Sequence, residues 1–366
     1  MNILILNLIL STSEKGVITR RRTNANTMIY NMARGFVALG HEVTLVAMDE
    51  FRPLEPEDNS FEVVYFKSSM PSLFKPDLLP KAKGLRKWLK RNTDRFDVVI
   101  SSELFSLATL TAARVCPEKL LVWHELSVMQ RALFKIPSRL WYHAVVPMFM
   151  RDVRVVARST DARSFVSRFC RNVSHIIADH GSDPEVFYPG DDGDTRDAFI
   201  IVSQLVPRKN IGHIVDVFAD FVRRPGYGHW QLDICGDGAE REALEKRVKE
   251  QGIEANVKFH GYCTHEQWAP LGRTAKGMLI DTLKDNNMVT VSECLCMATP
   301  VLMNTVPTIA TLVRECGAGI VADGWTADHL ERMATEYPAF RKAALAVAPT
   351  LTSTACAAKL LDSRTK

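Results

Sequence analysis

The sequence lacks the features that would place it among membrane-spanning, secreted or strongly charged proteins. Its 366 residues contain no run near the roughly 18 apolar residues that a membrane span requires. The apolar start, residues 3–10, has neither a basic segment nor a small-residue cleavage site, which indicates a first strand rather than a signal peptide. The net charge is only +4, so total charge does not indicate nucleic-acid binding. We therefore expect a globular protein that does not cross a membrane.

Paired cysteines are absent as well. No Cys-x-x-Cys motif occurs, and Cys294 and Cys296 stand too close together for the usual zinc spacing. The pattern indicates reduced thiols in the core of a cytosolic protein, and we predict no metal site. The eight cysteines are scattered, mostly within apolar runs: Cys116, Cys170, Cys235, Cys263, Cys294, Cys296, Cys316 and Cys356.

Apolar segments and helical segments alternate along the whole chain. Residues 2–10, 41–46, 97–102 and 119–123 read as strands in the first half, with a helix over 24–39. Residues 198–202, 231–235 and 257–261 read as strands in the second half, and the chain is helical by composition from about 327 onward. This alternation predicts parallel sheets covered by helices, and the length allows two separate cores.

Residues 276–304 direct the functional interpretation. A buried strand over 276–282 is followed by a loop, an apolar helix that ends at Pro300, and another strand from residue 301. Ligands of parallel sheets lie beyond the carboxyl ends of strands, so Asp285 in the loop and Glu293 about two helical turns later can hold sugar or ribose hydroxyls. A solvated Asp at a helix start and a Glu on a solvated helix face are the alternative, and spacing alone does not decide between them.

Lys209 stands in a second candidate loop. Residues 205–210 join a predicted strand to a helix over 211–223, and Asn210 is a suitable N-cap for that helix. Backbone amides and the helix dipole favour an anion beside Lys209.

Residues 80–95 are the most strongly basic segment, with seven Lys and Arg against the single acid Asp94. Trp88 stands beside a stripe of apolar residues at helical spacing. The pattern predicts a basic amphipathic helix that lies on an anionic bilayer, whereas an ordinary surface helix packed on its own core is the alternative. Arg20, Arg21 and Arg22 form a further basic cluster, which reads either as an acceptor contact or as a solvated loop. The candidate contacts of the basic segment with a membrane or acceptor are Lys81, Lys83, Lys87, Trp88 and Lys90.

Several stretches resemble the retaining glycosyltransferases of family 4. The spacing of Asp285 and Glu293 resembles their E-x7-E signature with Asp in place of the first Glu, and 298–301 is similar to the sequence that follows it. Residues 176–189 resemble their interdomain joint, 39–43 a turn in their first domain, and 162–167 a strand at its end. Residues 204–210 resemble their phosphate loop, but Gln204 replaces its Arg. The usual glycine pair of the first loop is missing, and the three arginines at 20–22 occupy that region.

The resemblance implies a GT-B fold, in which two Rossmann-like α/β domains face a central cleft. The implied bounds are 1–175 for an N-terminal acceptor domain, 176–197 for a linker and 198–344 for a nucleotide-sugar-binding domain. The tail, about 345–366, is expected to be able to cross back to the first domain.

The implied activity is retaining transfer of a sugar from a nucleotide-diphosphate sugar, such as a UDP- or GDP-sugar, to a hydroxyl acceptor. The acceptor is expected to be a lipid-linked or surface-polysaccharide precursor, and no metal or cofactor is expected. Lys209 would hold the leaving diphosphate, Glu293 the ribose, and Asp285 and His124 the donor sugar. The remaining donor-site candidates are Gln204, Arg208, Gly261, Tyr262, Asn286, Asn287 and Met288.

Two other functions stay open. A GT-B-type epimerase would use the same nucleotide-sugar cleft without an acceptor, and a catalytically silent sugar-nucleotide-binding or scaffolding subunit would not turn the donor over. Nucleotide release that requires an acceptor distinguishes the three. A cytoplasmic location is expected, with a peripheral position on the inner face of the membrane left open.

Overall fold

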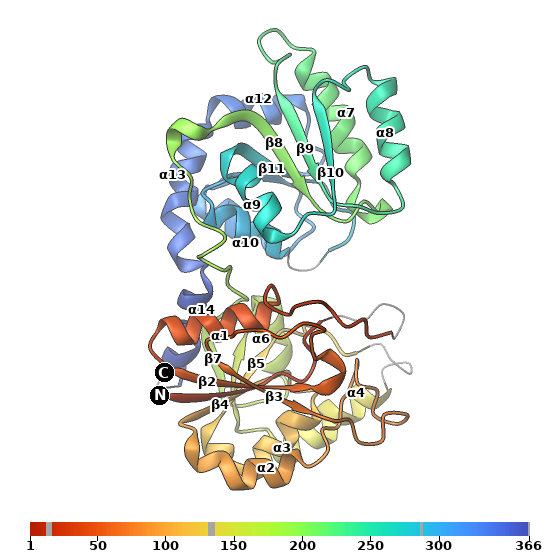
Figure 1. Cartoon of the computed structure of the whole chain (residues 1–366). Coiled ribbons are helices and arrows are strands. Elements are labelled where there is room, and N and C mark those ends of the chain that lie inside the picture. The colour runs from red at the N-terminus through yellow and green to blue at the C-terminus, as the bar shows by residue number, and fades with distance from the viewer. Residues whose placement is uncertain (12–16, 131–135, 286–287, 365–366) are drawn as a thin grey trace. The chain divides into compact units, whose positions relative to one another are not determined.

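The computed structural model describes residues 1–11, 17–130, 136–285 and 288–364, and the chain divides into two compact α/β units (Figure 1). Unit 1 comprises Met1–Gly181 and Ser353–Lys366, and unit 2 comprises Ser182–Thr352. The boundary after residue 181 falls within the expected linker 176–197, and the chain returns to unit 1 at residue 353, within the expected tail of about 345–366.

Unit 1 is built on a seven-stranded parallel sheet in the order β3-β2-β1-β4-β5-β6-β7. The strand order reverses between β1 and β4, which is the switch point where ligands of such sheets bind. The strands are β1 (Asn2–Leu6), β2 (Glu42–Met48), β3 (Glu62–Phe66), β4 (Val98–Ser102), β5 (Leu120–His124), β6 (Arg154–Ala157) and β7 (Val173–Ile177).

The last helix of the chain packs against the first helix of unit 1. The backbones of α1 and α14 approach closely because Gly35 has no side chain, and a Cβ there would lie 2.6 Å from the Ser353 carbonyl oxygen. The helices of unit 1 are α1 (Met28–Ala38), α2 (Leu85–Asn92), α3 (Leu107–Val115), α4 (Ile136–Leu140), α5 (Val146–Phe149), α6 (Thr160–Val166) and α14 (Ser353–Asp362). Short turns are η1 (Asp49–Phe51), η2 (Thr93–Arg95), η3 (Pro117–Lys119) and the π-helical η5 (Trp141–Val145).

Residues 162–167 are not the predicted strand. They belong mainly to helix α6, which begins after Ser159, whose Oγ accepts a hydrogen bond from the Ala162 amide at 3.1 Å. The strand of this region is β6, which ends at Ala157. A serine N-cap two residues after a buried strand is the local signal that starts a helix here.

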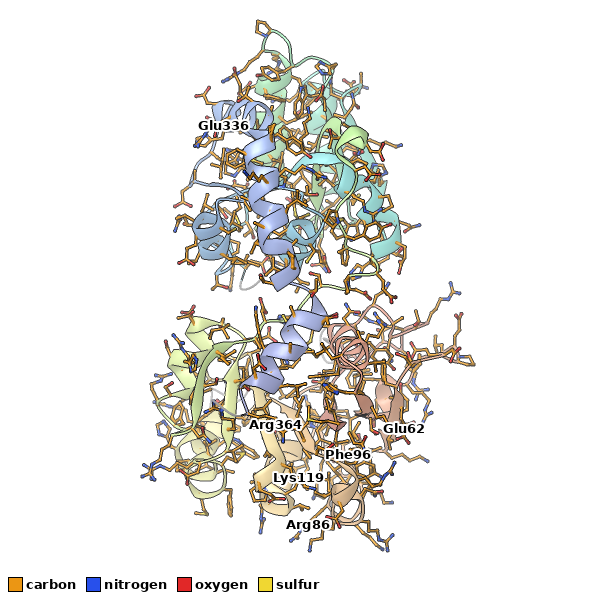
Figure 2. All side chains as sticks on the ribbon, turned by 90° about the vertical axis from the view of Figure 1, so that its left-hand side faces the viewer. Glu62, Arg86, Phe96, Lys119, Glu336 and Arg364 are labelled. Atoms are coloured by element: carbon orange, nitrogen blue, oxygen red, sulfur yellow. The ribbon has the colours of Figure 1, made fainter. Side chains whose placement is uncertain are left out.

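The basic helix is shorter than predicted, and its apolar side faces its own core. It begins after Gly84, which has a left-handed φ of 84°, and Leu85 and Leu89 are buried. Trp88 contacts the Phe66 ring edge-on at 5.8 Å and lies 6.2 Å from Phe96. These contacts favour the alternative of an ordinary surface helix. The basic residues remain exposed, and Figure 2 shows Arg86 at the outer rim of the unit.

Unit 2 contains a six-stranded parallel sheet in the order β10-β9-β8-β11-β12-β13, with its switch point between β8 and β11. The strands are β8 (Arg196–Val202), β9 (Gln231–Cys235), β10 (Val257–Gly261), β11 (Ala275–Ile280), β12 (Val301–Met303) and β13 (Gly319–Val321). The helices are α7 (Ile211–Val222), α8 (Arg241–Glu250), α9 (His265–Thr274), α10 (Val289–Cys296), α11 (Ala310–Cys316), α12 (Ala327–Thr335) and α13 (Tyr337–Val347). Short turns are η6 (Asp192–Asp194), η7 (Pro207–Lys209) and η8 (Ala348–Thr350).

Candidate functional site

Two loops at the switch point of unit 2 carry most of the predicted donor-site residues. The loop at 203–210 follows β8 and the loop at 281–285 follows β11, and these strands are neighbours in the sheet. Parallel strands end at the same edge, so the two loops meet. The Leu283 amide donates to the Arg208 carbonyl at 2.7 Å, and the Thr282 hydroxyl donates to the same oxygen at 3.0 Å.

Asp285 forms ion pairs with both basic residues of the first loop. Its Oδ2 atom lies 3.0 Å from Arg208 Nη1 and also contacts Lys209 Nζ. The side chain of Lys209 is only 10% exposed, so this pair is better shielded from water than a surface ion pair. The sequence assigned Lys209 to a diphosphate and Asp285 to a sugar; the structure brings the two side chains into direct contact.

Asn210 precedes α7, but its side chain does not cap the helix. The residue has a left-handed backbone (φ 50°, ψ 37°), and its Nδ2 donates to Asp281 Oδ2 at 2.6 Å. Asp281 is buried and also accepts from Asn304 Nδ2 at 3.2 Å, while His213 Nδ1 lies 2.8 Å from it. Asn210 is thus the N-cap residue, as predicted, but its side chain makes no capping hydrogen bond and is instead directed toward the Asp281 carboxylate. Asp281 was not identified as a candidate site residue from the sequence, although it directly follows β11.

The Gly-x-Gly at 236–238 lets the chain pass close to the Lys209 loop. A Cβ on Gly236 would lie 1.8 Å from the Ser203 carbonyl oxygen, and a Cβ on Gly238 would lie 2.4 Å from that of Leu205. The Leu205 amide donates to the Asp237 carbonyl at 2.9 Å. These glycines hold the candidate phosphate loop in place by close backbone contact.

Glu293 is buried in α10, so the alternative that placed it on a solvated helix face is wrong. Burial raises the pKa of its carboxyl to about 8, because the charged form loses its hydration. His265 Nε2 lies 3.8 Å from Glu293 Oε1. A buried carboxyl with a raised pKa is typical of a functional position, where it can donate as well as accept hydrogen bonds.

The other donor-site candidates take varied positions in unit 2. Gln204 is exposed and Met288 is buried directly before α10. Gly261 ends β10 with a left-handed φ of 71°, and Tyr262 after it is strongly exposed. Asn286 and Asn287 lie outside the described residues.

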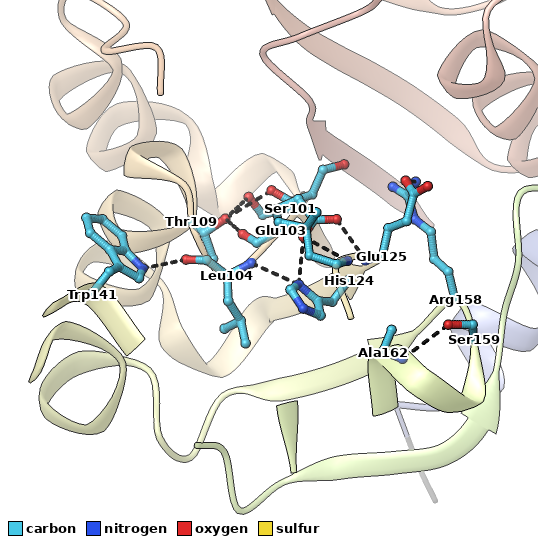
Figure 3. Close-up of polar contacts among 12 residues, drawn as sticks. Ser101, Glu103, Leu104, Thr109, His124, Glu125, Trp141, Arg158, Ser159 and Ala162 are labelled. Atoms are coloured by element: carbon cyan, nitrogen blue, oxygen red, sulfur yellow. Dashed lines mark hydrogen bonds and ion pairs between the residues drawn. The ribbon is translucent and has the colours of Figure 1, made fainter. Parts of the chain in front are cut away.

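His124 ends β5 as predicted, but its ring is completely buried within unit 1. Its Nδ1 lies 2.8 Å from Glu103 Oε2 (Figure 3). Its ring stacks on that of Phe165, with the ring centroids 6.2 Å apart and an interplanar angle of 12°. Its Nε2 atom has no hydrogen-bond partner among the described residues. The Glu103 pair and Phe165 therefore enclose the imidazole in this structure.

Glu103 has a left-handed backbone with φ 66°, which is costly for a residue with a side chain. Its carboxylate accepts from the Glu125 amide at 2.7 Å in addition to the His124 contact. Burial alone would raise the pKa of Glu103, but the charge and hydrogen bond of His124 outweigh burial and lower it. The strained loop thus holds a carboxylate against the imidazole.

A second charged group lies beside this pair. Arg158 Nη1 donates to Glu125 Oε2 at 2.8 Å (Figure 3). Its guanidinium lies over the Trp123 ring, 3.7 Å from the ring centroid. His180 lies between carboxylates, with Nδ1 2.5 Å from Asp179 and Nε2 3.6 Å from Glu125. Burial would raise the pKa of Glu125, but His180 and Arg158 lower it to about 2.

The sequence interpretation missed these charged residues of unit 1, although a signal was available. Glu103, Glu125 and Arg158 each directly follow the last residue of a strand, and Asp179 and His180 follow β7 closely. Charged residues at successive carboxyl ends meet at one edge of a parallel sheet.

Two other features of unit 1 can be placed on the sheet. Arg20 Nη2 donates at 3.1 Å to the carbonyl of Asp49, which directly follows β2 at the same carboxyl edge, and Arg22 pairs with Glu55 at 2.8 Å. A cavity of about 780 Å³ is lined by Val98, Leu120 and Arg154, which begin their strands. That cavity therefore lies at the opposite edge of the sheet.

Comparison with protein families identifies both halves of the chain. The model described as "Glycosyltransferase Family 4" matches residues 25–178, and "Glycosyl transferases group 1" matches residues 189–337. An α-D-kanosaminyltransferase of Streptomyces kanamyceticus is 24% identical over 144 residues. That match spans 38% of this chain and 37% of the relative, well under two thirds of its length.

Solved structures share the fold over nearly the whole chain. Anabaena HepE in complex with UDP is 14% identical with a TM-score of 0.66, covering 100% of both chains. The lipopolysaccharide outer core galactosyltransferase WaaB is 15% identical with a TM-score of 0.63, covering 99% of each chain. A glycosyltransferase from Rickettsia africae has a TM-score of 0.64 at 12% identity, covering 99% of this chain and 97% of that one. Two Rossmann-like units of this kind are the GT-B architecture.

Proposed function

Because the chain belongs to the group 1 and family 4 glycosyltransferases, we propose that it transfers a sugar from a nucleotide-diphosphate sugar to a hydroxyl acceptor with retention of configuration. The observation that carries this proposal is the joining of Arg208, Lys209 and Asp285 at the switch point of unit 2. The two cations there could bind the diphosphate of such a donor, and the carboxylate could accept hydrogen bonds from the hydroxyls of its sugar.

The basic side chains would stabilise the leaving diphosphate. Negative charge develops on the bridging oxygen as the glycosidic bond breaks, and Lys209, Arg208 and the first amides of α7 provide fixed positive partners. The leaving phosphate can accept the proton of the attacking hydroxyl, so this scheme uses neither a protein base nor a metal. Asp285 would exchange its cation contacts for a sugar hydroxyl when the diphosphate arrives.

Glu293 would hold the ribose of the donor. Its buried carboxyl can accept from one ribose hydroxyl and, when protonated, donate to another. HepE has been crystallised with UDP and with UDP-glucose, so UDP-sugars are the first donors to test.

His124 would contact the donor sugar through Nε2, with Glu103 fixing the opposite ring nitrogen. The absence of a partner for Nε2 among the described residues supports this role. The contact requires the enclosing side chains to move, since the ring is buried in this structure.

A lipid-linked or surface-polysaccharide precursor is the acceptor class that we propose. The exposed lysines on and around α2 support an anionic or membrane-bound acceptor, and the similar fold of WaaB, a lipopolysaccharide galactosyltransferase, suggests where to begin. We also propose a cytoplasmic location, since the scheme needs nucleotide sugars.

The test is nucleotide release from a panel of UDP-, GDP- and ADP-sugars, with and without acceptor lipids or oligosaccharides, in the presence of EDTA. The expected result is acceptor-dependent release and a product with the donor's anomeric configuration by NMR. Acceptor-independent conversion of the donor would favour an epimerase, and binding without turnover would favour a silent subunit. Activity lost in EDTA and restored by a divalent cation would overturn the metal-free scheme.

A further inference from the structure

Asp281 is a buried carboxylate to which the proposed reaction gives no role. It directly follows β11, and only 7% of its surface is exposed. Its Oδ2 accepts from Asn210 Nδ2 at 2.6 Å and lies 2.8 Å from His213 Nδ1, and its Oδ1 accepts from Asn304 Nδ2 at 3.2 Å. Protein groups therefore occupy both oxygens, so any effect of Asp281 on a ligand must pass through one of these neighbours.

The surroundings hold the Asp281 carboxylate in a fixed position. Asn304 is buried directly after β12, and its Nδ2 also donates to the Thr282 carbonyl at 2.8 Å. The ring of the fully buried Trp325 meets that of His213 edge-on, with the ring centroids 5.6 Å apart. A carboxylate fixed by neighbouring elements can in turn fix a group that binds to it.

Asn210 is the neighbour that lies in the candidate phosphate loop. It stands between Lys209 and the first residue of α7, and its backbone is left-handed, a conformation that asparagine tolerates better than most residues. An N-cap residue normally has an extended backbone, and its side chain accepts a hydrogen bond from the second or third amide of the helix. Asn210 makes no such bond, because its side chain is directed to Asp281.

The start of α7 is open as a result. The first amides of an α-helix have no partner within the helix. The His213 amide donates to the Asn210 carbonyl at 3.2 Å, whereas the amides of Ile211 and Gly212 make no hydrogen bond to any other described residue. A side chain that capped α7 would occupy the position in which these amides can bind an anion.

We propose that Asp281 is a positioning residue for the diphosphate of the donor. By binding the side-chain amide of Asn210, it keeps that side chain away from the start of α7, and it holds the left-handed turn between Lys209 and the open amides. The inference rests on the proposed function and deepens it, because it identifies the group that keeps the phosphate loop ready for an anion.

A purely structural role for Asp281 makes a different prediction. Loss of a buried carboxylate that accepts hydrogen bonds would destabilise unit 2, and a second substitution at Asn210 would not reverse the effect. In the proposed role, Asp281 acts on the ligand through the Asn210 side chain. Removal of that side chain should therefore compensate for the loss of Asp281, which a double-mutant cycle measures.

The experiment is calorimetric titration of the full chain with UDP, GDP, ADP and inorganic pyrophosphate. Asp281→Ala should weaken binding of pyrophosphate and of the preferred nucleotide roughly fivefold or more, since an anion must then displace an N-cap. Asp281→Ala/Asn210→Gly should recover most of this loss, because glycine adopts the left-handed conformation and has no side chain to cap the helix. Asp323→Ala is the matched control and should bind as wild type does; Asp323 accepts from the Thr305 amide at 2.9 Å, beyond β13 of the same sheet.

Thermal unfolding without ligand verifies the fold of each variant. If Asp281→Ala does not fold, Asn210→Ser provides the test: serine is a preferred N-cap with a side chain one bond shorter, so it should cap α7 and weaken pyrophosphate binding without lowering the Tm.

Two results would overturn this inference alone, while wild type still binds a nucleotide. They are equal affinity of wild type and the folded Asp281→Ala or Asn210→Ser variant, and a double variant that binds no more tightly than Asp281→Ala. Wild type that binds neither pyrophosphate nor any of the nucleotides would overturn the proposed function together with this inference.

Discussion

Asp285 shows how one side chain can control two others. Its carboxylate lies 3.0 Å from Arg208 Nη1 and also contacts Lys209 Nζ. A diphosphate that binds these cations must compete with Asp285 for them. In the proposed scheme the carboxylate would therefore weaken nucleotide binding in the resting protein, and it would become available to the sugar only when the diphosphate displaces it. Its cost to binding and its contribution to turnover can be measured separately.

Asp285→Asn should bind the nucleoside diphosphate more tightly and turn over more slowly. Loss of a partly shielded ion pair is worth about 1 kcal/mol, or roughly fivefold in Kd. Calorimetric titration with UDP or GDP and steady-state kinetics test the two effects. Weaker nucleotide binding in this variant would show that Asp285 does not compete with the diphosphate.

Lys209→Ala should lower kcat/KM by about 2.7–4 kcal/mol of transition-state stabilisation, the range for losing one donor to a developing charge. Lys284→Ala provides a matched control, because this exposed lysine lies in the adjacent loop. The control should retain activity. Equal activity of Lys209→Ala and wild type would remove Lys209 from the phosphate site.

Glu293 should make the stability of unit 2 depend on pH. Burial raises the pKa of its carboxyl from about 4.5 to about 8, so the folded chain holds a proton that the unfolded chain has released. Stability should therefore fall by a few kcal/mol, as an order of magnitude, between about pH 4.5 and pH 8, and then level off. Urea unfolding of wild type and Glu293→Gln at several pH values measures this difference. Parallel pH profiles would contradict the buried titration.

Glu293→Ala should weaken nucleotide binding itself, since a ribose contact exists both before and during the reaction. Its UDP affinity should fall along with its kcat/KM. Unchanged affinity for every nucleotide tested would mean that Glu293 is not at the ribose.

At the scale of helices, strands and loops, the sequence predicts an element well where apolar residues repeat at a clear spacing and where identifiable residues mark the beginning and end of the element. Helix α7 was predicted within one residue because apolar residues recur at helical spacing up to Arg223. The segment 162–167 was misread, because its apolar residues fit either a strand or a buried helix and only Ser159 marks the helix start.

The positions of Asp285 and Lys209 in loops were predictable, whereas their contact was not. That contact depends on which strands are neighbours, which local sequence does not encode.

The surface lysines around α2 should contribute charge, but not an apolar anchor, to membrane binding. Changing Lys81, Lys83, Lys87 and Lys90 to Ser should weaken sedimentation with anionic vesicles by roughly tenfold, since each basic residue near such a surface contributes up to about 1 kcal/mol. Nucleotide binding should stay unchanged throughout. A quadruple variant that sediments as wild type does would show that α2 does not face the lipid.

At the scale of the whole molecule, the chain leaves unit 1 after Gly181 and returns at Ser353. Helix α14 completes the first unit, with Cys356, Ala357 and Leu360 buried. The alternation of elements in the sequence predicted two α/β units, and helical composition predicted the final helices. The packing of α14 on Gly35 could not be predicted, because it rests on a backbone contact between residues 318 positions apart in the chain, at 35 and 353.

Gly35→Val should destabilise unit 1 and spare unit 2. The added side chain would begin 2.6 Å from the Ser353 carbonyl oxygen, so α14 must shift. We expect a loss of about 1–3 kcal/mol, typical of overpacking a close contact. Gly193→Ala, where no atom lies within 4 Å of the added Cβ, serves as the control. Thermal unfolding should show a lower Tm for Gly35→Val with UDP binding retained; an unchanged Tm would contradict the close packing of α14.

The return of the chain to unit 1 also fixes an order of events during synthesis. The ribosome releases all of unit 2 before α14, so the second unit can fold while the first still lacks its last helix. Until translation reaches residue 362, the surface of α1 around Gly35 stays uncovered in the nascent chain. A chain stalled before Ser353 would thus combine a complete second unit with an incomplete first one, and it would be a substrate for chaperones and proteases.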